Sequence, residues 1–267
     1  MNKSKGKKVK SKKRKLIKFL QFIFILFIVI AACLYLKYGP TVSALYKDAT
    51  AKVNSCTIDT FNVNRSRNPN GVGNKDPLYL KSEDIPKNAK NAFVAIEDKD
   101  FYKHGGISIN AIFRSVYSIA TNDWKLTQGG STITQQLARN VFLNFDKNYQ
   151  RKLEEMFIAI KLEDKFSKDQ ILEFYINNIN FSNNAYGINT ASKKFFNKSC
   201  QQLNLSEICF LTAIPNDPEY YDPIKHMDNT LQRRNLVLDS MKKYNYITDE
   251  QYKEAINYKI VLNLNKS

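Results

Sequence analysis

The chain has 267 residues, of which 43% are hydrophobic and 12% are aromatic, enough for a packed core, so global disorder is excluded. Its length allows one ordinary domain with an anchor, or two small domains. The formal net charge is +16, and residues 1–18 hold ten Lys and Arg and no acid. Subtracting, 16 − 10 leaves +6 for the remainder, so a mildly basic domain follows a strongly basic tail.

An unbroken run of 18 residues, Phe19 to Leu36, is apolar except for Gln21. A helix needs about 18–20 such residues to cross a bilayer. The basic tail before the run predicts a single-pass anchor in the cell membrane, with a cytoplasmic N-terminus and an extracytoplasmic domain. This topology explains the basic tail without nucleic acid as a partner. A lipoprotein signal at Cys33 is the alternative, although the apolar run continues past it.

The four cysteines, Cys33, Cys56, Cys200 and Cys209, form no C-x-x-C and no zinc-type spacing. We expect reduced or buried thiols, while a disulfide from Cys56 to Cys200 or Cys209 remains an alternative. The sequence offers no cluster of metal ligands.

Residues 37–80 are interpreted as a linker and lead-in, with a loop at 62–75, and residues 81–260 as one domain. Helices are predicted from Pro86 to Glu97, Ile107 to Ala120, Tyr149 to Glu163 and Leu205 to Ile214, and after the capping residues Ser167 and Thr248. The predicted apolar faces are Ile109, Ile112, Phe113 and Val116 in the second of these helices, and Leu153, Met156, Phe157 and Ile160 in the third. No convincing strand pattern follows residue 80, so the fold class is mainly α.

Three carboxylates gather at the end of the first predicted helix: Glu97, Asp98 and Asp100, followed by His104 and a glycine pair. Carboxylates that repel one another hold protons more tightly, which suits a general base that works near neutrality. The alternative is a polar helix end followed by a turn.

A second stretch, Gln128 to Asn140, places two glycines, hydroxyls and then amides before a predicted helix. A helix N-terminus attracts anions, and Arg139 and Lys147 add full charges. The alternative is a capped helix with a polar face. In the next helix, Arg151 and Glu155 are expected to form a solvated pair one turn apart.

Together these stretches resemble the peptidoglycan glycosyltransferases of glycosyltransferase family 51, found alone or as the N-terminal half of class A penicillin-binding proteins. The resemblance rests on the order Glu97-Asp98-x-x-Phe101-x-x-His104-x-Gly106, Gly129 to Leu137, Arg151-Lys152-x-x-Glu155 and Ile171-Leu172-Glu173-x-Tyr175-x-Asn177, and runs from about Ile85 to about Tyr252. It implies a membrane-anchored, lysozyme-like bilobal helical fold that polymerises lipid II into β-1,4 glycan strands with inversion, releasing undecaprenyl pyrophosphate. Moenomycin, which occupies the donor site in this family, should inhibit it.

The resemblance also implies roles for individual residues. Glu97 would be the general base for the acceptor 4-hydroxyl, and Glu155 a second acid that assists the donor pyrophosphate or an associated cation. The substrate-binding positions would be Ser131, Thr132, Gln135, Gln136, Arg139, Lys147, Arg151 and Lys152. The supporting positions would be Asp98, Phe101, His104, Gly106, Glu173, Tyr175 and Asn177. No cofactor is required, although Mg²⁺ or Mn²⁺ could bridge carboxylate and diphosphate.

Several residues depart from the family pattern. Ser182, Asn184 and Asn197 stand where glycines are usual, and Lys147 stands where arginine is common, without arginine's bidentate fork. Both glutamates remain, so we expect an active enzyme. No K-T-G follows, and Ser240 begins a chance S-x-x-K, so we expect no transpeptidase half.

Two other functions stay open. A lysozyme-like hydrolase would also use a helix-end glutamate, but it has no diphosphate to explain the basic cluster. A catalytically silent scaffold for cell-wall synthesis or division proteins would fit the departures. The partners expected of the enzyme are lipid II, the growing glycan chain and the membrane.

Overall fold

The computed structural model describes residues 3–63, 75–111, 113, 130–143 and 149–264. Within these residues there is no named strand, and the single bridge joins Asn180 and Tyr186. The predicted mainly α class is therefore confirmed. The α-helices are α1 (Lys3–Ser55), α2 (Ile58–Phe61), α3 (Lys87–Glu97), α5 (Ile133–Phe142), α6 (Tyr149–Lys165), α7 (Lys168–Asn178), α8 (Ile188–Phe196), α9 (Leu205–Ala213), α10 (Met227–Lys243) and α11 (Asp249–Asn257), with short 3-10 turns η1 (Ser82–Asp84), η2 (Phe101–Lys103), η3 (Cys200–Gln202) and η4 (Ile214–Asn216).

The chain divides into two compact units, Met1–Asp48 and Ala49–Ser267. The first unit is the long N-terminal part of α1, which is helical through the whole run from Phe19 to Leu36 and contains Pro40. In the described part of the chain, no helix combines the length and the apolar character that crossing a membrane requires.

The last turns of α1 belong to the second unit. Ala49 and Val53 are buried in its core, together with Cys56 and Phe61. The ammonium of Lys165, at the end of α6, donates to the carbonyl oxygens of Val53, Asn54 and Cys56 at 2.7–3.0 Å, which satisfies acceptors at the C-terminus of α1. Part of the predicted lead-in is thus built into the folded unit.

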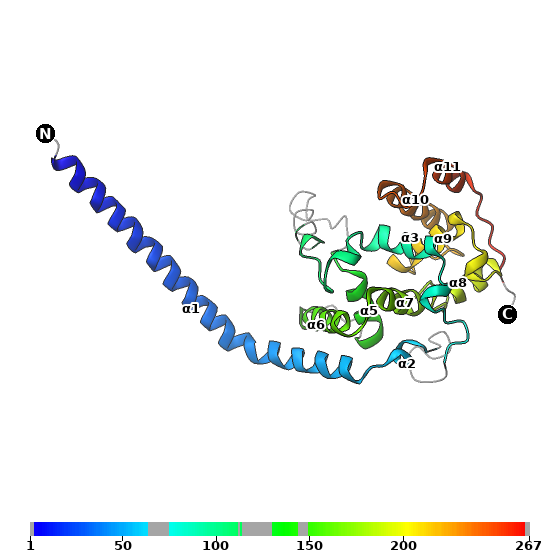
Figure 1. Ribbon diagram of the computed structural model, residues 1–267, viewed down its shortest axis with the longest axis horizontal. Helices are drawn as coiled ribbons and strands as arrows, with labels where there is room; N and C mark the ends of the chain where they lie inside the picture. Colours follow the sequence, from blue (N-terminus) through cyan, green and yellow to red (C-terminus); the bar gives the residue numbers. More distant parts are fainter. Residues whose placement is uncertain (1–2, 64–74, 112, 114–129, 144–148, 265–267) are drawn as a thin grey trace. The chain divides into compact units, whose positions relative to one another are not determined.

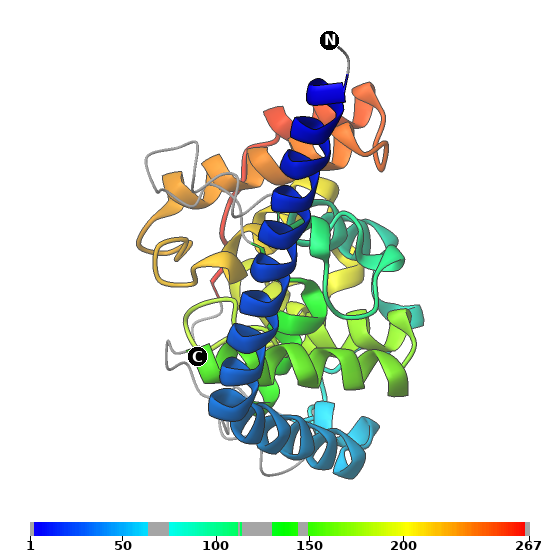
Figure 2. The same ribbon diagram turned by 90° about the vertical axis from the view of Figure 1, so that its left-hand side faces the viewer.

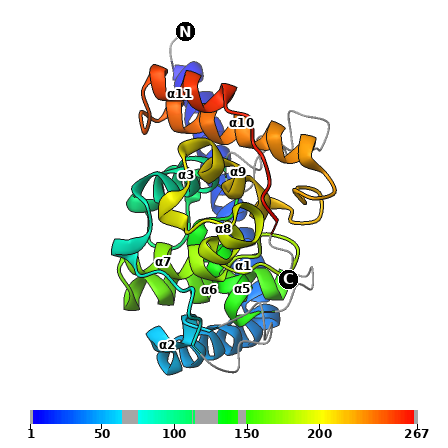
Figure 3. The ribbon, with the colours of Figure 1, turned by 90° about the vertical axis from the view of Figure 1, so that its right-hand side faces the viewer.

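The second unit contains two groups of helices. In one group α5 packs against α6 and α7, and in the other α10 packs against α9 and α3. The three ribbon views agree that α10 and α11 lie at the opposite end of this unit from α6 (Figures 1, 2 and 3). The two groups are therefore distinct in space as well as in their contacts.

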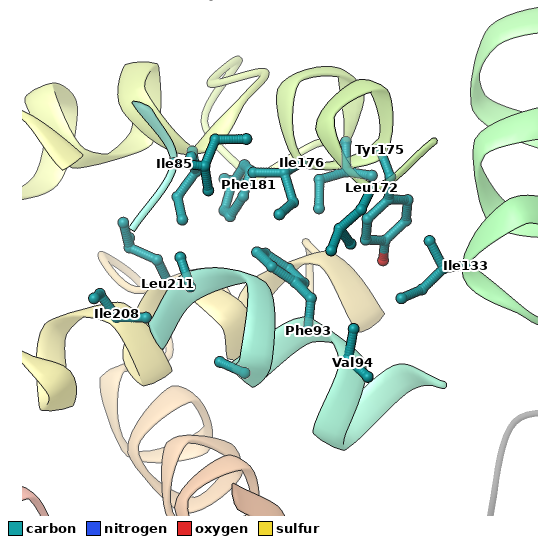
Figure 4. Close-up of a cluster of buried hydrophobic side chains, with 14 of the residues drawn as sticks. Ile85, Phe93, Val94, Ile133, Leu172, Tyr175, Ile176, Phe181, Ile208 and Leu211 are labelled. Carbon is teal, nitrogen blue, oxygen red and sulfur yellow. The ribbon is translucent and has the colours of Figure 1, made fainter. Parts of the chain in front are cut away.

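Buried side chains between α3, α7 and α9 join the two groups (Figure 4). The ring of Phe93 on α3 meets Tyr175 and Phe181 edge to face, with centroids 5.7 and 6.3 Å apart. Ile208 and Leu211 of α9 belong to the same cluster (Figure 4). This packing holds the C-terminal end of α3 in a fixed position.

Several predicted helix boundaries are confirmed. Helix α3 ends at Glu97, with Pro86 as its N-cap residue. Capping boxes begin α7 at Ser167 and α11 at Thr248. Helix α9 ends at Ala213, before Pro215. Helices α8 and α10 were not predicted.

The predicted apolar face of α6 is wrong. The residues that α6 buries are Glu155, Ile158, Ala159 and Leu162, whereas Leu153, Met156, Phe157 and Ile160 are only partly buried. The two sets share the same helical spacing but are offset by two residues, which is about 200° around a helix. The prediction chose the stripe without a charge, whereas the fold buries the stripe that contains Glu155.

The predicted helix from Ile107 to Ala120 lies mostly outside the described residues. Ile109 and Phe113, assigned to its apolar face, are 67% and 68% exposed. The prediction that these two side chains pack in the core is therefore wrong.

All four cysteines are free thiols. Cys56, Cys200 and Cys209 are buried and Cys33 is exposed, so the expectation of reduced thiols is confirmed. Burial raises the pKa of the Cys200 thiol to about 12. The three buried thiols therefore act as small apolar groups in the core.

Candidate active site

Glu97 is held by both of its carboxylate oxygens. The side-chain amide of Gln136 on α5 donates to Oε2 at 2.9 Å, and the Arg233 guanidinium on α10 donates to Oε1 at 3.2 Å. The side chain is 10% exposed, so it sits at a surface without being free in solvent. Arg233 was not among the predicted site residues. Its signal in the sequence was a pair of adjacent arginines, Arg233 and Arg234, in a segment without a predicted helix.

The acidic cluster expected around Glu97 does not form a group of repelling carboxylates. Asp98 accepts from Nε2 of His104 at 2.9 Å and from the backbone N–H of Ile133 at 3.0 Å. Asp100 pairs with Lys99 at 3.3 Å and with Lys103 at 3.2 Å. Burial opposes ionisation of Asp100, but hydrogen bonds from these two lysines outweigh it and lower its pKa. Separate partners for each acid replace the expected repulsion.

The start of α5 is a closed capping arrangement. Thr132 Oγ1 accepts from the N–H of Gln135 at 3.1 Å, and the side chain of Gln135 accepts from the N–H of Thr132 at 2.9 Å. The hydroxyl of Thr132 donates to the carbonyl of Gly106 at 2.7 Å. Both side chains are buried, so two predicted substrate-binding positions hold the loop and the helix together in this structure.

Gly106 links this cap to α6. Its φ is +87°, a conformation that favours glycine, and an added Cβ would lie 2.7 Å from the carbonyl oxygen of Ala159. Phe101, just before it, is fully buried, and the ammonium of Lys168 lies 4.4 Å from its ring centroid. The segment after Glu97 is thus anchored on α6 and α7.

Glu155 forms a second charged centre. Its side chain is fully buried, and it accepts from Nη1 of Arg151 at 2.9 Å and from Nζ of Lys152. Lys152 also donates to the hydroxyl of Ser131 at 2.9 Å. The expectation of a solvated Arg151–Glu155 pair is wrong, because the buried face of α6 carries Glu155 inward.

Tyr175 connects the core to Glu97 through Gln136. Its hydroxyl donates to Oε1 of Gln136 at 3.1 Å, which leaves the amide nitrogen of Gln136 for Glu97. Burial raises the pKa of Tyr175 well above its usual range, and the charge of Glu97 acts in the same direction. Tyr175 therefore remains a neutral donor.

Glu173 and Asn177 fix the segment before α3. Glu173 accepts from the Tyr79 hydroxyl at 2.6 Å and from the N–H of Ser82 at 2.8 Å. Asn177 binds both backbone groups of Leu80, at 2.8 and 2.9 Å. These two predicted supporting residues therefore have direct structural contacts.

The α5 segment brings the two charged centres into one framework. Ser131 contacts Lys152, and Gln136, five residues after Ser131 in the chain, contacts Glu97. Arg139, on the same helix, lies within electrostatic range of Tyr175, where its positive charge partly opposes the rise in the Tyr175 pKa that burial causes. Lys147 lies outside the described residues. In the described part of the chain, no group of three or more His, Cys, Asp or Glu is placed to hold a metal ion.

Fold and site define a class of protein: a helical domain in which α5 and the residue before it connect a carboxylate at a helix end to a buried acid that binds two cations. A family model described as Transglycosylase matches residues 67–242. The chain belongs to this transglycosylase family.

Named relatives agree with this assignment. Penicillin-binding protein 1A of Aquifex aeolicus is 43% identical over 70% of this chain and 26% of its own length. Penicillin-binding protein 4 of Bacillus subtilis is 41% identical over 68% and 29%, and penicillin-binding protein 1A of Escherichia coli 40% over 69% and 22%. The chain thus spans about a quarter of the length of these relatives. A crystal structure of penicillin-binding protein 1A from Haemophilus influenzae covers 70% of this chain and 18% of its own, at 21% identity and a TM-score of 0.41.

Proposed function

We propose that the chain is a peptidoglycan glycosyltransferase that polymerises lipid II into β-1,4 glycan strands. The observation that carries this proposal is Glu97, fixed at the end of α3 by Gln136 and Arg233 yet 10% exposed. A general base must be held within hydrogen-bonding reach of the hydroxyl that it deprotonates. The two helix groups are compatible with the lysozyme-like, bilobal arrangement that the family resemblance implies.

In the proposed reaction, Glu97 takes the proton from the 4-hydroxyl of the acceptor sugar. The oxygen attacks the anomeric carbon of the donor from the face opposite its diphosphate. The new C–O bond forms as the bond to the diphosphate breaks, so the configuration inverts and undecaprenyl pyrophosphate leaves with the electron pair. Arg139, Lys147, Arg151 and Lys152 would stabilise the negative charge that develops on the diphosphate.

Glu155 takes a positioning role in this proposal. Arg151 and Lys152 both bind its carboxylate, and we propose that it holds these cations in place for the donor diphosphate. Each oxygen of Glu155 has one of these cations as a partner and keeps a lone pair, so a Mg²⁺ or Mn²⁺ that bridged Glu155 and the diphosphate could bind beside them.

We also propose that Phe19–Leu36 anchors the chain in the cell membrane, with residues 1–18 in the cytoplasm and the catalytic domain outside. The support is the apolar run and the basic tail before it. A lipid-linked substrate requires a site near the bilayer, which such an anchor supplies.

The test is to incubate the purified full chain with labelled lipid II and, separately, with finished glycan. Chain growth from lipid II supports the glycosyltransferase, whereas release of muropeptides from polymer identifies a hydrolase.

Glu97→Gln should lower turnover by ~10²-fold or more while lipid II binding persists, because a general base is lost. The control is Glu83→Gln, which removes the same charge from an exposed position in η1. Full turnover in Glu97→Gln would contradict the assignment, and cellular function without any turnover would identify a scaffold.

A further inference from the structure

Two adjacent arginines on α10 serve different parts of the fold. Arg234 is buried and donates from Nη1 to the Ser206 hydroxyl at 2.5 Å and to the Ala255 carbonyl at 3.0 Å, so it ties α10 to α9 and α11. Arg233 instead donates to Oε1 of Glu97 at 3.2 Å. Because α10 packs on both α9 and α3, one residue fixes the helix and its neighbour reaches the candidate base.

Among the residues that the structure describes, one hydrogen-bond donor contacts each oxygen of the Glu97 carboxylate. Gln136 cannot turn its amide without losing the Tyr175 hydroxyl at its Oε1, so its nitrogen stays aimed at Oε2 of Glu97. Arg233 occupies the other oxygen. Two donors on opposite oxygens, from two different helices, fix the plane of the carboxylate. Each oxygen keeps a lone pair that can accept a proton.

The guanidinium of Arg233 is itself constrained. Its Cζ lies 5.2 Å from the ring centroid of Tyr221, and its side chain is 14% exposed. Its Nε is buried and has no hydrogen-bond partner among the residues that the structure describes. An unsatisfied buried N–H costs stability, so the placement of Arg233 is not the one that stability alone would favour.

We propose that Arg233 is a positioning residue for the glycosyl transfer reaction. It orients the Glu97 carboxylate toward the acceptor hydroxyl. This inference rests on the proposed function. It assigns Arg233 no contact with the diphosphate, which distinguishes it from the cations on α5 and α6. Its effect must therefore pass through Glu97.

The experiment compares Arg233→Gln and Arg233→Lys with wild type for lipid II polymerisation and lipid II affinity. We expect Arg233→Gln to lower kcat by roughly 10- to 100-fold, the cost of misplacing a catalytic group, with lipid II affinity within about twofold of wild type. Arg233→Lys should recover part of the rate, because lysine keeps the charge and loses the planar fork. Lys243→Gln, an exposed charge loss on the same helix, is the matched control and should leave kcat unchanged.

A double variant separates action through Glu97 from direct action on the substrate. In a Glu97→Gln background, Arg233→Gln should produce little further loss, because the two residues act as a unit. An equal loss in both backgrounds would overturn the proposal, and so would a folded Arg233→Gln enzyme with wild-type kcat. If Arg233→Gln unfolds, Arg233→Lys carries the same comparison. A wild-type chain that does not polymerise lipid II would refute the proposed function instead, so the two failures are distinguishable.

Discussion

The carboxylate of Asp98 accepts the backbone N–H of Ile133, the first residue of α5, at 3.0 Å. Asp98 follows Glu97 directly, and α5 carries Gln136, so this one hydrogen bond joins the end of α3 to the helix that holds the candidate base. An anionic acceptor at a helix N-terminus is favoured by the helix dipole. His104 shares the same carboxylate at 2.9 Å.

Replacing Asp98 by Asn should therefore weaken the link between α3 and α5. We expect Asp98→Asn to lower the free energy of unfolding by about 1–3 kcal/mol, the range for hydrogen bonds to charged groups. Urea unfolding measures it. Asp100→Asn serves as the control, because Asp100 pairs with lysines at the surface and its loss should cost no more than about 0.5 kcal/mol. Equal stability of the two variants would contradict the proposed linking role of Asp98.

Glu155→Gln should reduce both stability and turnover. The change leaves Arg151 and Lys152 without their buried anion, and breaking a buried pair costs roughly 3–5 kcal/mol. We expect a smaller loss of about 2–3 kcal/mol, because the side chain of Lys152 is 40% exposed and partly screened by solvent. Chemical denaturation and lipid II turnover check the two effects. Asp164→Asn, an exposed acid on the same helix, should change neither, and a Glu155→Gln variant as stable as wild type would show that the pair is not needed.

Ser182→Gly should stabilise the protein. Ser182 has a φ of +70°, in the left-handed region that costs a non-glycine residue about 1–2 kcal/mol. Removing its side chain also removes the contact with the Asn183 amide at 3.1 Å, so the expected net gain is about 0.5–1 kcal/mol. Asn197, with a φ of +54°, is the comparison, because asparagine tolerates this region and Asn197→Gly should gain less. Thermal unfolding of both variants would rank them, and the reverse order would count against this explanation.

Asp222 should contribute stability that is lost in acid. Burial opposes its ionisation, but hydrogen bonds from the Asn183 amide and from the N–H groups of Ile224 and Lys225 outweigh burial and lower its pKa. A lowered folded-state pKa means that the contribution is complete above the unfolded-state value, near 4, and falls away as pH drops through the folded-state value. Between roughly pH 5 and pH 3, the range in which an unfolded-state carboxyl group titrates, the free energy of unfolding should fall more steeply with pH for wild type than for Asp222→Asn. Parallel curves would show that Asp222 does not titrate differently on folding.

Moenomycin should inhibit the enzyme, since the family resemblance places it in the donor site. Its affinity can be measured by competition with labelled lipid II. Lys147→Arg should strengthen binding, because arginine offers a bidentate fork to phosphate that lysine lacks. An enzyme that turns over lipid II in the presence of saturating moenomycin would contradict the donor-site assignment.

The sequence by itself determined the features that depend on neighbouring residues. Serine or threonine three residues before glutamine predicted the starts of α7 and α11, and the apolar spacing after Pro86 placed Glu97 at the end of α3. Spacings of this kind act within one or two helical turns, so they are readable without a fold. The order of the motifs was also sufficient to indicate the transglycosylase family that the comparison then confirmed.

Only the tertiary structure decided which partners these residues have. Two stripes of α6 have the same spacing, and packing against α5 buries the one that contains Glu155. Arg233 lies 136 positions from Glu97 in the chain, and the two meet only because α10 packs on α3. The three neighbouring acids looked like one group but have separate partners, since the side chains of residues at and just after a helix end point in different directions. Contacts between distant helices depend on the whole packing arrangement, which local periodicity does not encode.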